Sequence, residues 1–289
     1  MDSAIRLVAD IKALLGEGPV WVERDQALFW VDIKGRRLFR LDEAGVREWA
    51  TPLRVGSIAP RATGGFIAGT DAGFQAIELG EEAVFTPLLN PEADLPTNRF
   101  NDGKVDRVGR FWAGTMDDRE EEALGTLYRL DAVDRCVAAD RGYRVTNGPA
   151  FSPAGDVVYH TDSALRTIYR FPLAADGSLG ERSVFAHFTA DEGFPDGMTV
   201  DAEGCLWVAF WGGWAVRRLS PTAELLSVIE VPVQRPTSVA FGGPDLDRLY
   251  ITSARIGLDR AALDVQPLAG ALLMVEPGVS GLAERPFAG

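Results

Sequence analysis

The sequence predicts an all-β fold, a six-bladed β-propeller with about four antiparallel strands in each blade. Six short apolar runs recur along the 289 residues, and each has the composition of a buried strand. The central residues of these runs are Trp30, Ile67, Trp112, Tyr159, Trp207 and Tyr250. Successive central residues are 37, 45, 47, 48 and 43 positions apart. A period of about 40 to 50 residues with several strands in each unit is typical of a β-propeller.

Local turn and strand patterns support this division at each repeat. Before every run lies a short segment rich in Gly or Asp, as tight hairpin turns require. These turn segments are residues 23–25, 63–65, 108–109, 154–156, 202–204 and 244–247. After four of the runs, apolar and polar residues alternate with a period of two, which indicates a strand with one buried face. The alternating segments are residues 37–41, 125–130, 167–171 and 215–219.

The chain length fits six blades of about four strands each, and neither end looks like a separate domain. The last blade needs a strand from one end of the chain, and we expect residues near the N-terminus to supply it. No stretch shows a convincing helical period bounded by caps. We therefore expect a single propeller domain over residues 1–289.

Composition argues against several classes of partner. The net charge of −13 disfavours nucleic acid or an anionic membrane as a partner. No apolar run approaches the roughly 18 residues that span a bilayer, and the N-terminal segment carries Arg6, Asp10 and Lys12 where a secretory signal would be apolar. The two cysteines are too few for a disulfide framework or a zinc cluster. We expect a soluble, cytoplasmic protein that is a monomer or a weak homo-oligomer.

Four of the six repeats carry an acidic or amide residue at nearly the same distance before the central residue. Glu17, Asn101, Asn147 and Asp196 precede their central residues by 13, 11, 12 and 11 positions. In a radial fold, equivalent positions of different blades face one axis, so we expect these side chains to meet. The same offset in the other two repeats falls at Gly56 and Val239, which would leave one side of the site open.

The donor atoms in this group are all oxygens. Glu17, Asn147, Asp196 and the neighbouring Asp102 are each followed directly by Gly, as a backbone that passes close to the axis requires. Carboxylates gathered without balancing cations need a bound cation. Hard oxygen donors favour Ca²⁺, while Zn²⁺, Mn²⁺, Mg²⁺ and Fe²⁺ are also acceptable. The alternative is that each residue merely shapes a turn.

Other kinds of catalytic site find little support. The sequence has no Gly-x-Ser-x-Gly nucleophile elbow, phosphate loop, dinucleotide fingerprint or HExxH motif. His160 is more simply a packed or solvent-facing strand residue than a catalytic one. Trp211 and Trp214 either form the wall of a sugar pocket or pack in the core.

Several longer motifs resemble those of the regucalcin/gluconolactonase (senescence marker protein) family, and in particular its bacterial sugar lactonases. The most specific segment is residues 99–106 (RFNDGKVD), followed by residues 109–116 (GRFWAGTM). The other matching segments are residues 147–152, 195–198, 201–204, 242–245 and 249–252. The resemblance covers nearly the whole chain, from residue 15 to residue 255.

The resemblance implies a six-bladed propeller with one divalent metal ion. Glu17, Asn147 and Asp196 would bind the ion, and Asp196 would also act as the general base. Arg99 and Asn101 would hold the hydroxyl and carbonyl oxygens of the substrate.

The family also places an acidic residue that touches substrate hydroxyls after the Gly-Thr-Met segment. Asp117, Glu120 and Glu121 are the candidates here, and Glu120 is the one that we assign to substrate binding.

The function implied is metal-dependent hydrolysis of a sugar (aldono-) lactone to the aldonic acid. A pentono- or hexonolactone such as xylono-, arabinono- or gluconolactone would be the substrate. One alternative is a metal-dependent propeller esterase or phosphotriesterase, and another is a non-enzymatic binding module. The binding module is disfavoured because the blades lack repeated Gly-His and Trp-Asp signatures, and because a scaffold needs no carboxylates on its axis.

Overall fold

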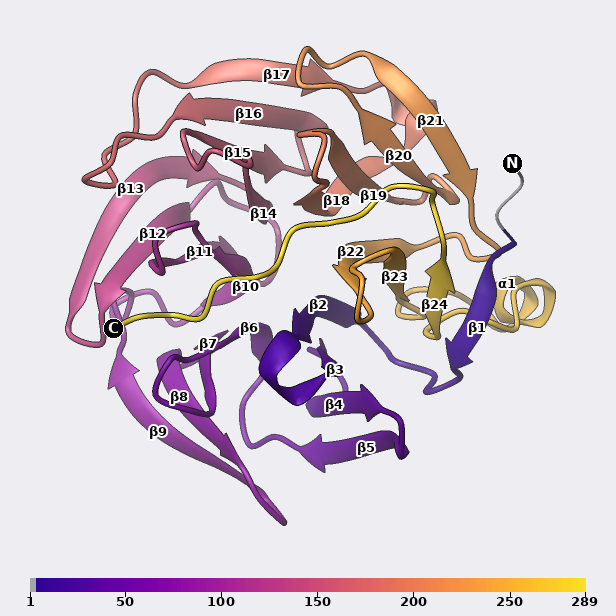
Figure 1. Cartoon of the computed structure of the whole chain (residues 1–289), viewed down its shortest axis with the longest axis horizontal. Coiled ribbons are helices and arrows are strands. Elements are labelled where there is room, and N and C mark those ends of the chain that lie inside the picture. Colours follow the sequence, from indigo (N-terminus) through magenta and orange to yellow (C-terminus); the bar gives the residue numbers. More distant parts are fainter. Residues whose placement is uncertain (1–3) are drawn as a thin grey trace.

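Six four-stranded antiparallel sheets form a closed ring in the computed structural model, which describes residues 4–289 (Figure 1). The sheets follow one another around the ring in chain order, because each inner strand packs between the inner strands of the sheets before and after it. The predicted six-bladed propeller with four antiparallel strands per blade is therefore confirmed. The expectation of one domain over residues 1–289 includes residues 1–3, which lie outside the described part of the chain.

Five sheets are built from consecutive strands, numbered here from the axis outward. The first contains β2 (Gly16–Val22), β3 (Ala27–Asp32), β4 (Arg37–Asp42) and β5 (Gly45–Ala50). The second contains β6 (Val55–Pro60), β7 (Phe66–Thr70), β8 (Gly73–Leu79) and β9 (Ala83–Leu89). The third contains β10 (Asn98–Val105), β11 (Phe111–Asp117), β12 (Gly125–Ala132) and β13 (Arg135–Tyr143). The fourth contains β14 (Thr146–Phe151), β15 (Val157–Asp162), β16 (Thr167–Pro172) and β17 (Ser183–His187). The fifth contains β18 (Phe194–Val200), β19 (Leu206–Trp211), β20 (Ala215–Leu219) and β21 (Leu225–Glu230).

The sixth sheet joins the two ends of the chain. It contains β22 (Pro236–Gly242), β23 (Arg248–Ser253) and β24 (Leu272–Val275), and β1 (Arg6–Ala9) is its outermost strand. β1 pairs antiparallel with β24, with Arg6 opposite Met274. The N-terminal segment thus completes the last blade, as expected, and closes the ring.

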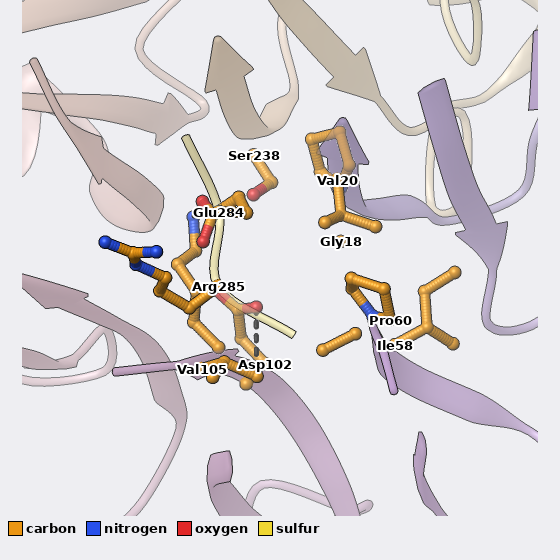
Figure 2. A pocket seen from close by; sticks show the side chains of 13 residues that line it. Gly18, Val20, Ile58, Pro60, Asp102, Val105, Ser238, Glu284 and Arg285 are labelled. Atoms are coloured by element: carbon orange, nitrogen blue, oxygen red, sulfur yellow. Dashed lines mark hydrogen bonds and ion pairs between the residues drawn. The ribbon is translucent and has the colours of Figure 1, made fainter. Parts of the chain in front are cut away.

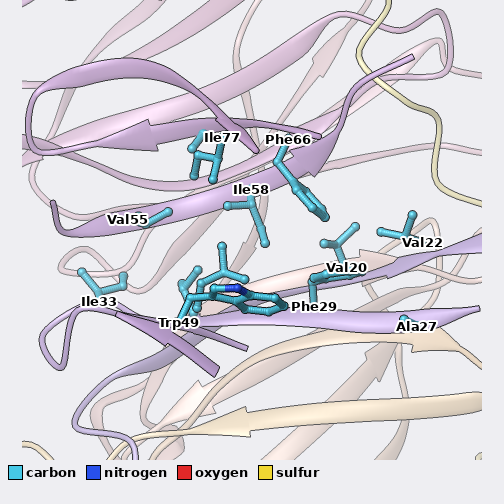
Figure 3. Close-up of a cluster of buried hydrophobic side chains, with 13 residues drawn as sticks. Val20, Val22, Ala27, Phe29, Ile33, Trp49, Val55, Ile58, Phe66 and Ile77 are labelled. Carbon is cyan, nitrogen blue, oxygen red and sulfur yellow. The ribbon is translucent and has the colours of Figure 1, made fainter. Parts of the chain in front are cut away.

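All six central residues of the apolar runs lie on the second strand from the axis. They are buried on β3, β7, β11, β15, β19 and β23. Apolar side chains of neighbouring sheets meet between the blades. Figure 3 shows the cluster between the first two sheets, where the rings of Phe29 and Phe66 lie 4.7 Å apart. Each such fully buried side chain contributes about 1.5–3 kcal/mol through removal from water, so these clusters hold the ring together.

Two buried aspartates fix the turns before the tryptophan strands. Asp106 accepts hydrogen bonds from the indole of Trp112 and from the backbone N–H of Arg110. Asp201 accepts equivalent bonds from the indole of Trp207 and from the N–H of Cys205. The same six-residue spacing therefore ties turn and strand in the third and fifth blades.

The connection between β23 and β24 contains one α-helix, α1 (Arg260–Val265), which the sequence pattern did not predict. Its N-cap is Asp259, whose side chain accepts a hydrogen bond from the N–H of Ala262. At six residues the helix is too short to show a helical period in the sequence. Single turns of 3₁₀ helix cover Glu23–Asp25 and Ala190–Glu192. Within residues 4–289, no helix has the length and apolar character needed to cross a membrane.

The C-terminal segment crosses one face of the ring after β24 (Figure 1). It bridges to the fifth blade through Gly281 and Asp201, and to the second through Phe287 and Arg61. Figure 2 shows Glu284 and Arg285 of this segment beside Asp102. The cavity left there is about 10 Å³, enough for about one water molecule. This end of the axis is therefore closed.

Candidate active site

A cavity of about 530 Å³ opens at the other end of the axis, where the inner strands begin. Five of the six blades contribute to its lining. Its lining residues are Leu15, Glu17, Lys34, Arg99, Asn101, Met116, Glu120, Arg144, Val145, Asn147, Ser163, Ala164, Phe194, Asp196, Trp211, Arg235, Ile256 and Gly257. A cavity of this size holds a small organic molecule.

Every residue that the sequence assigned to the site lines this cavity. These residues are Glu17, Arg99, Asn101, Glu120, Asn147 and Asp196. All of them are buried except Glu120, which is exposed at the mouth. The structure thus brings the candidate residues together, and their individual roles stay predictions.

A β-bulge turns these side chains toward the axis. In each blade that supplies a candidate, the pairing between the inner and second strands shifts next to the candidate, as after Glu17 and after Asn147. A bulge adds unpaired residues to one strand and redirects the local side chains. Gly148 needs its positive φ of 75° here, and a Cβ on Gly197 would lie 2.1 Å from the hydroxyl of Ser238.

The sixth blade shifts its pairing in the same way, but two positions earlier relative to its central residue than the third, fourth and fifth blades do. Its unpaired residues are Thr237 and Ser238, while Val239 is back in register and packed in the core. In the second blade the shift surrounds Gly56, which has no side chain to offer. These two blades therefore supply no charged group at the level of the bulge.

A chain of hydrogen bonds orients the two candidate amides. Arg99 Nη1 donates to Asn101 Oδ1 at 2.6 Å. Asn101 Nδ2 in turn donates to Asn147 Oδ1 at 3.1 Å. Asn147 Nδ2 donates to Ser163 Oγ at 2.8 Å. Because both amide nitrogens have acceptors, the oxygen of Asn147 is the atom available to a cation.

Arg99 is held by a carboxylate that the sequence reading missed. Arg99 Nε donates to Asp118 Oδ1 at 2.6 Å, and Lys34 and Arg54 also bond to Asp118 at 2.7 and 2.5 Å. Although burial opposes it, the bonds from Lys34 and Arg99 hold the pKa of Asp118 well below its usual range. Arg99 therefore has a carboxylate partner within the protein whatever molecule occupies the cavity. Within the described residues, only its Nη2 lacks a protein partner.

Among the three acidic candidates after the Gly-Thr-Met segment, only Glu120 lines the cavity. The side chain of Asp117 is fully buried and accepts hydrogen bonds from Arg119 Nε and from the N–H of Glu121. Asp117 therefore shapes the loop, and Glu120 is the carboxylate that can reach a molecule in the cavity.

Three buried carboxyl groups repel one another near the axis. Burial, followed by repulsion from Asp102, raises the pKa of Glu17 well above its usual value. Burial, then Glu17, then Asp102 raise the pKa of Asp196 in the same way. Asp102 lies toward the closed end, accepts hydrogen bonds from the N–H groups of Gly103 and Gly148, and has its pKa raised by burial to about 6.

This donor set suits a divalent cation. Within residues 4–289, no three His, Cys, Asp or Glu side chains are grouped to hold a metal ion. The predicted set does not need such a group, since it combines the carboxylates of Glu17 and Asp196 with the amide oxygen of Asn147. A cation bound between them would offset the burial and the repulsion that raise both carboxyl pKa values. The residues present therefore fit a hard, oxygen-liganded ion.

Three basic residues that line the cavity were not predicted from the sequence. Lys34, Arg144 and Arg235 add positive charge, and none belongs to a motif near the candidate carboxylates. Arg235 lies over the indole of Trp211, with 4.7 Å from the guanidinium carbon to the ring centroid. Trp211 thus forms a wall of the cavity, whereas Trp214 is exposed outside it.

His160 lies outside the candidate site. It is fully buried, packs edge-on against Tyr143 with ring centroids 4.7 Å apart, and does not line the cavity. Burial lowers its pKa to about 3, so the imidazole is neutral. Its role is packing.

The fold and the cavity define the class: a six-bladed propeller with a polar site at one end of its axis. The chain belongs to the SMP-30/Gluconolactonase/LRE-like family, which it matches over residues 15–255. This confirms the family resemblance of the sequence motifs.

Relatives match the chain over essentially its full length. The 6-deoxy-6-sulfogluconolactonase of Pseudomonas putida is 39% identical, with 100% of both chains covered. The L-arabinolactonase of Azospirillum brasilense is 35% identical, covering 98% of this chain and 95% of the relative. The crystal structure of regucalcin from Agrobacterium tumefaciens, a calcium-binding protein, superposes with a TM-score of 0.93 at 32% identity, covering 99% and 97%.

Proposed function

We propose that this protein is a divalent-metal-dependent hydrolase that opens a sugar (aldono-) lactone to the aldonic acid. One observation carries the proposal: two buried carboxylates, an amide oxygen and the Arg99–Asn101 pair line a single cavity. The full-length relatives that act on L-arabinolactone and 6-deoxy-6-sulfogluconolactone support the same reaction class.

Glu17, Asn147 and Asp196 would hold the cation through oxygen atoms. Ca²⁺ fits these ligands best, and Zn²⁺, Mn²⁺, Mg²⁺ and Fe²⁺ are the other candidates. When bound, the ion supplies Lewis-acid polarisation of the lactone carbonyl.

Asp196 is the proposed general base. It takes a proton from the attacking water as the new bond forms between the water oxygen and the carbonyl carbon. The bond from that carbon to the ring oxygen then breaks, and Asp196 returns the proton to the ring oxygen. No covalent enzyme intermediate is required.

Arg99, Asn101 and Glu120 would position the substrate. Arg99 offers Nη2, and Asn101 offers the remaining acceptor capacity of Oδ1, because its other amide contacts are already made within the protein. Glu120 stands at the mouth, where it can accept hydrogen bonds from sugar hydroxyls.

A substrate panel tests this proposal. Metal-stripped protein, reloaded separately with each of the five candidate ions, is assayed on arabinono-, xylono- and gluconolactone, on a homoserine lactone and on a phosphotriester. We expect metal-dependent turnover of the sugar lactones. Turnover of the phosphotriester or the homoserine lactone in preference to every sugar lactone would support the esterase alternative instead. Binding without turnover of any ester would support a binding module. The cytoplasmic location and the monomeric or weakly oligomeric state stay predictions of the sequence.

A further inference from the structure

Arg235 and Arg99 occupy the same register position in opposite blades. In the third blade the last regular pair before the bulge is Phe100 with Thr115, and Arg99 comes directly before Phe100. In the sixth blade that pair is Pro236 with Ser253, and Arg235 comes directly before Pro236. The third and sixth blades face each other across a six-membered ring. The two guanidinium groups therefore line opposite walls of the cavity.

The two arginines differ in what neutralises them. Arg99 pairs with Asp118. No carboxylate among the described residues lies within 4.0 Å of the Arg235 guanidinium, which donates instead to the backbone carbonyls of Ile256 and Gly257. Burial alone acts on its pKa, which it lowers, but a guanidinium stays protonated in proteins.

The acidic residues that line the cavity cannot supply the missing counter-charge. Glu17 and Asp196 belong to the proposed cation site, and Glu120 lies on the third blade, across the cavity from Arg235. Arg144, exposed on the fourth blade, adds a further positive charge to the lining and also makes no ion pair in the described part of the chain.

Several contacts hold the Arg235 side chain in place. The guanidinium carbon of Arg235 lies over the indole of Trp211, 4.7 Å from the ring centroid, in a cation–π contact. The loop at Gly257 passes so close that a Cβ there would lie 2.7 Å from Arg235 Nη1. Nη1 donates to the carbonyl of Ile256 and Nη2 to that of Gly257, so the Nε–H and one further N–H on each terminal nitrogen have no protein acceptor among the described residues. Two parallel N–H donors match the oxygens of a sulfonate or phosphate group.

We propose that Arg235 and Trp211 form a subsite for a sulfonate or phosphate group carried at the end of the lactone substrate furthest from its carbonyl. This inference rests on the proposed lactonase function. It narrows the substrate class from neutral sugar lactones to those with an anionic terminal substituent.

The kinetic test compares lactones that differ only at the terminal carbon. We would measure kcat/KM for gluconolactone, 6-deoxy-6-sulfogluconolactone and 6-phosphogluconolactone, in the wild type and in Arg235→Gln. We expect the wild type to prefer an anionic lactone by at least about tenfold, and Arg235→Gln to remove that preference while changing gluconolactone turnover by less than about threefold, because charged hydrogen bonds contribute at this scale. The sulfonate and phosphate arms show which oxyanion is favoured.

Arg47→Gln is the matched control. Arg47 also stacks on a tryptophan, with 4.5 Å to the ring of Trp49, and donates to a backbone carbonyl, that of Gly80, but it lies outside the cavity. The control should keep the wild-type ratio between anionic and neutral lactones. Equal kcat/KM for the two classes in the wild type, or an equal fall for both in Arg235→Gln, would overturn the subsite.

A binding measurement separates the subsite from the reaction. Calorimetry would give the affinity of the metal-loaded protein for 6-phosphogluconate and for gluconate, two ligands that differ only in the terminal group. We expect 6-phosphogluconate to bind at least about tenfold more tightly, and Arg235→Gln to abolish this difference. If that difference is found but no lactone is hydrolysed, the subsite stands and the proposed function fails. If neutral lactones are hydrolysed but neither assay shows a preference, the proposed function stands and the subsite fails.

Discussion

Asn101 Nδ2 donates a hydrogen bond to Asn147 Oδ1 at 3.1 Å, across the boundary between the third and fourth blades. This bond joins a proposed substrate-binding residue to a proposed metal ligand. The same amide of Asn101 also donates to the carbonyl of Thr146 at 2.7 Å. Asn101 therefore helps to hold the fourth blade's ligand in place, besides any contact that it makes with substrate.

Replacement of Asn101 by Ala should weaken metal binding as well as substrate binding. Loss of a residue that orients a ligand typically costs about 10–100-fold in metal affinity. Titration of metal-free protein with Ca²⁺ or Mn²⁺, followed by calorimetry, measures the effect directly. Asn90→Ala, on the exposed surface, is the control. Unchanged metal affinity in Asn101→Ala would show that Asn147 is positioned without it.

Replacement of Asp118 by Asn should impair both stability and turnover. Asp118 binds Lys34, Arg54 and the buried Arg99, so the change leaves a buried guanidinium without its carboxylate. We expect a loss of about 1–3 kcal/mol in the free energy of unfolding and a fall in kcat/KM through misplacement of Arg99.

Asp42→Asn is the control for this variant. The side chain of Asp42 is as exposed as that of Asp118, at 23%, but its partner Arg40 lies outside the cavity. Surface pairs of this kind contribute about 0–1 kcal/mol. Equal effects of the two variants on unfolding and turnover would show that Asp118 does not position Arg99 for catalysis.

Stability should fall in acid partly because of His160. Its pKa is about 3 in the folded protein and about 6.5 when unfolded. Between these pH values the imidazole of the unfolded chain binds a proton that the folded protein does not bind. The contribution of the buried neutral imidazole to the free energy of unfolding is therefore fully present above about pH 6.5 and is lost as the pH falls. The slope is about 1.4 kcal/mol per pH unit. Denaturant unfolding from pH 7.5 to 4.5 measures it.

His160→Leu should remove this part of the pH dependence, and His187→Leu, at an exposed position, serves as the control. Comparison with the variants is needed because Glu17 and Asp196 also titrate on unfolding, with the opposite sign. A His160→Leu variant with the wild-type slope would contradict the assignment of His160 as a buried neutral imidazole.

The recurrent pattern of the blades could be predicted because it is local. Each central residue lies on a hairpin whose length is set by its turn, so nearly the same offset finds the inner strand in the four blades that carry Glu17, Asn101, Asn147 and Asp196. An offset of 11 residues points to Val239 in the sixth blade, whereas the bulge there falls at Thr237 and Ser238.

The charges around the cavity could not be predicted in this way. Asp118 and Lys34 are 84 positions apart in the chain, and Arg235 meets Trp211 only through the packing of two blades. Which arginine is neutralised depends on such long-range contacts. Asp102 illustrates the same limit, since it shares the Gly-flanked pattern of the other carboxylates but faces the closed end of the axis.

In the proposed mechanism, Asp196 both binds the metal ion and acts as the base. The most direct test measures metal affinity and sugar-lactone turnover together for the wild type, Asp196→Asn and Asp196→Ala. We predict that Asp196→Asn keeps much of the metal affinity but loses turnover, because an amide can ligate a cation but cannot take up the proton. Asp196→Ala should lose both. Near-normal turnover by the metal-loaded Asp196→Asn variant would contradict the account.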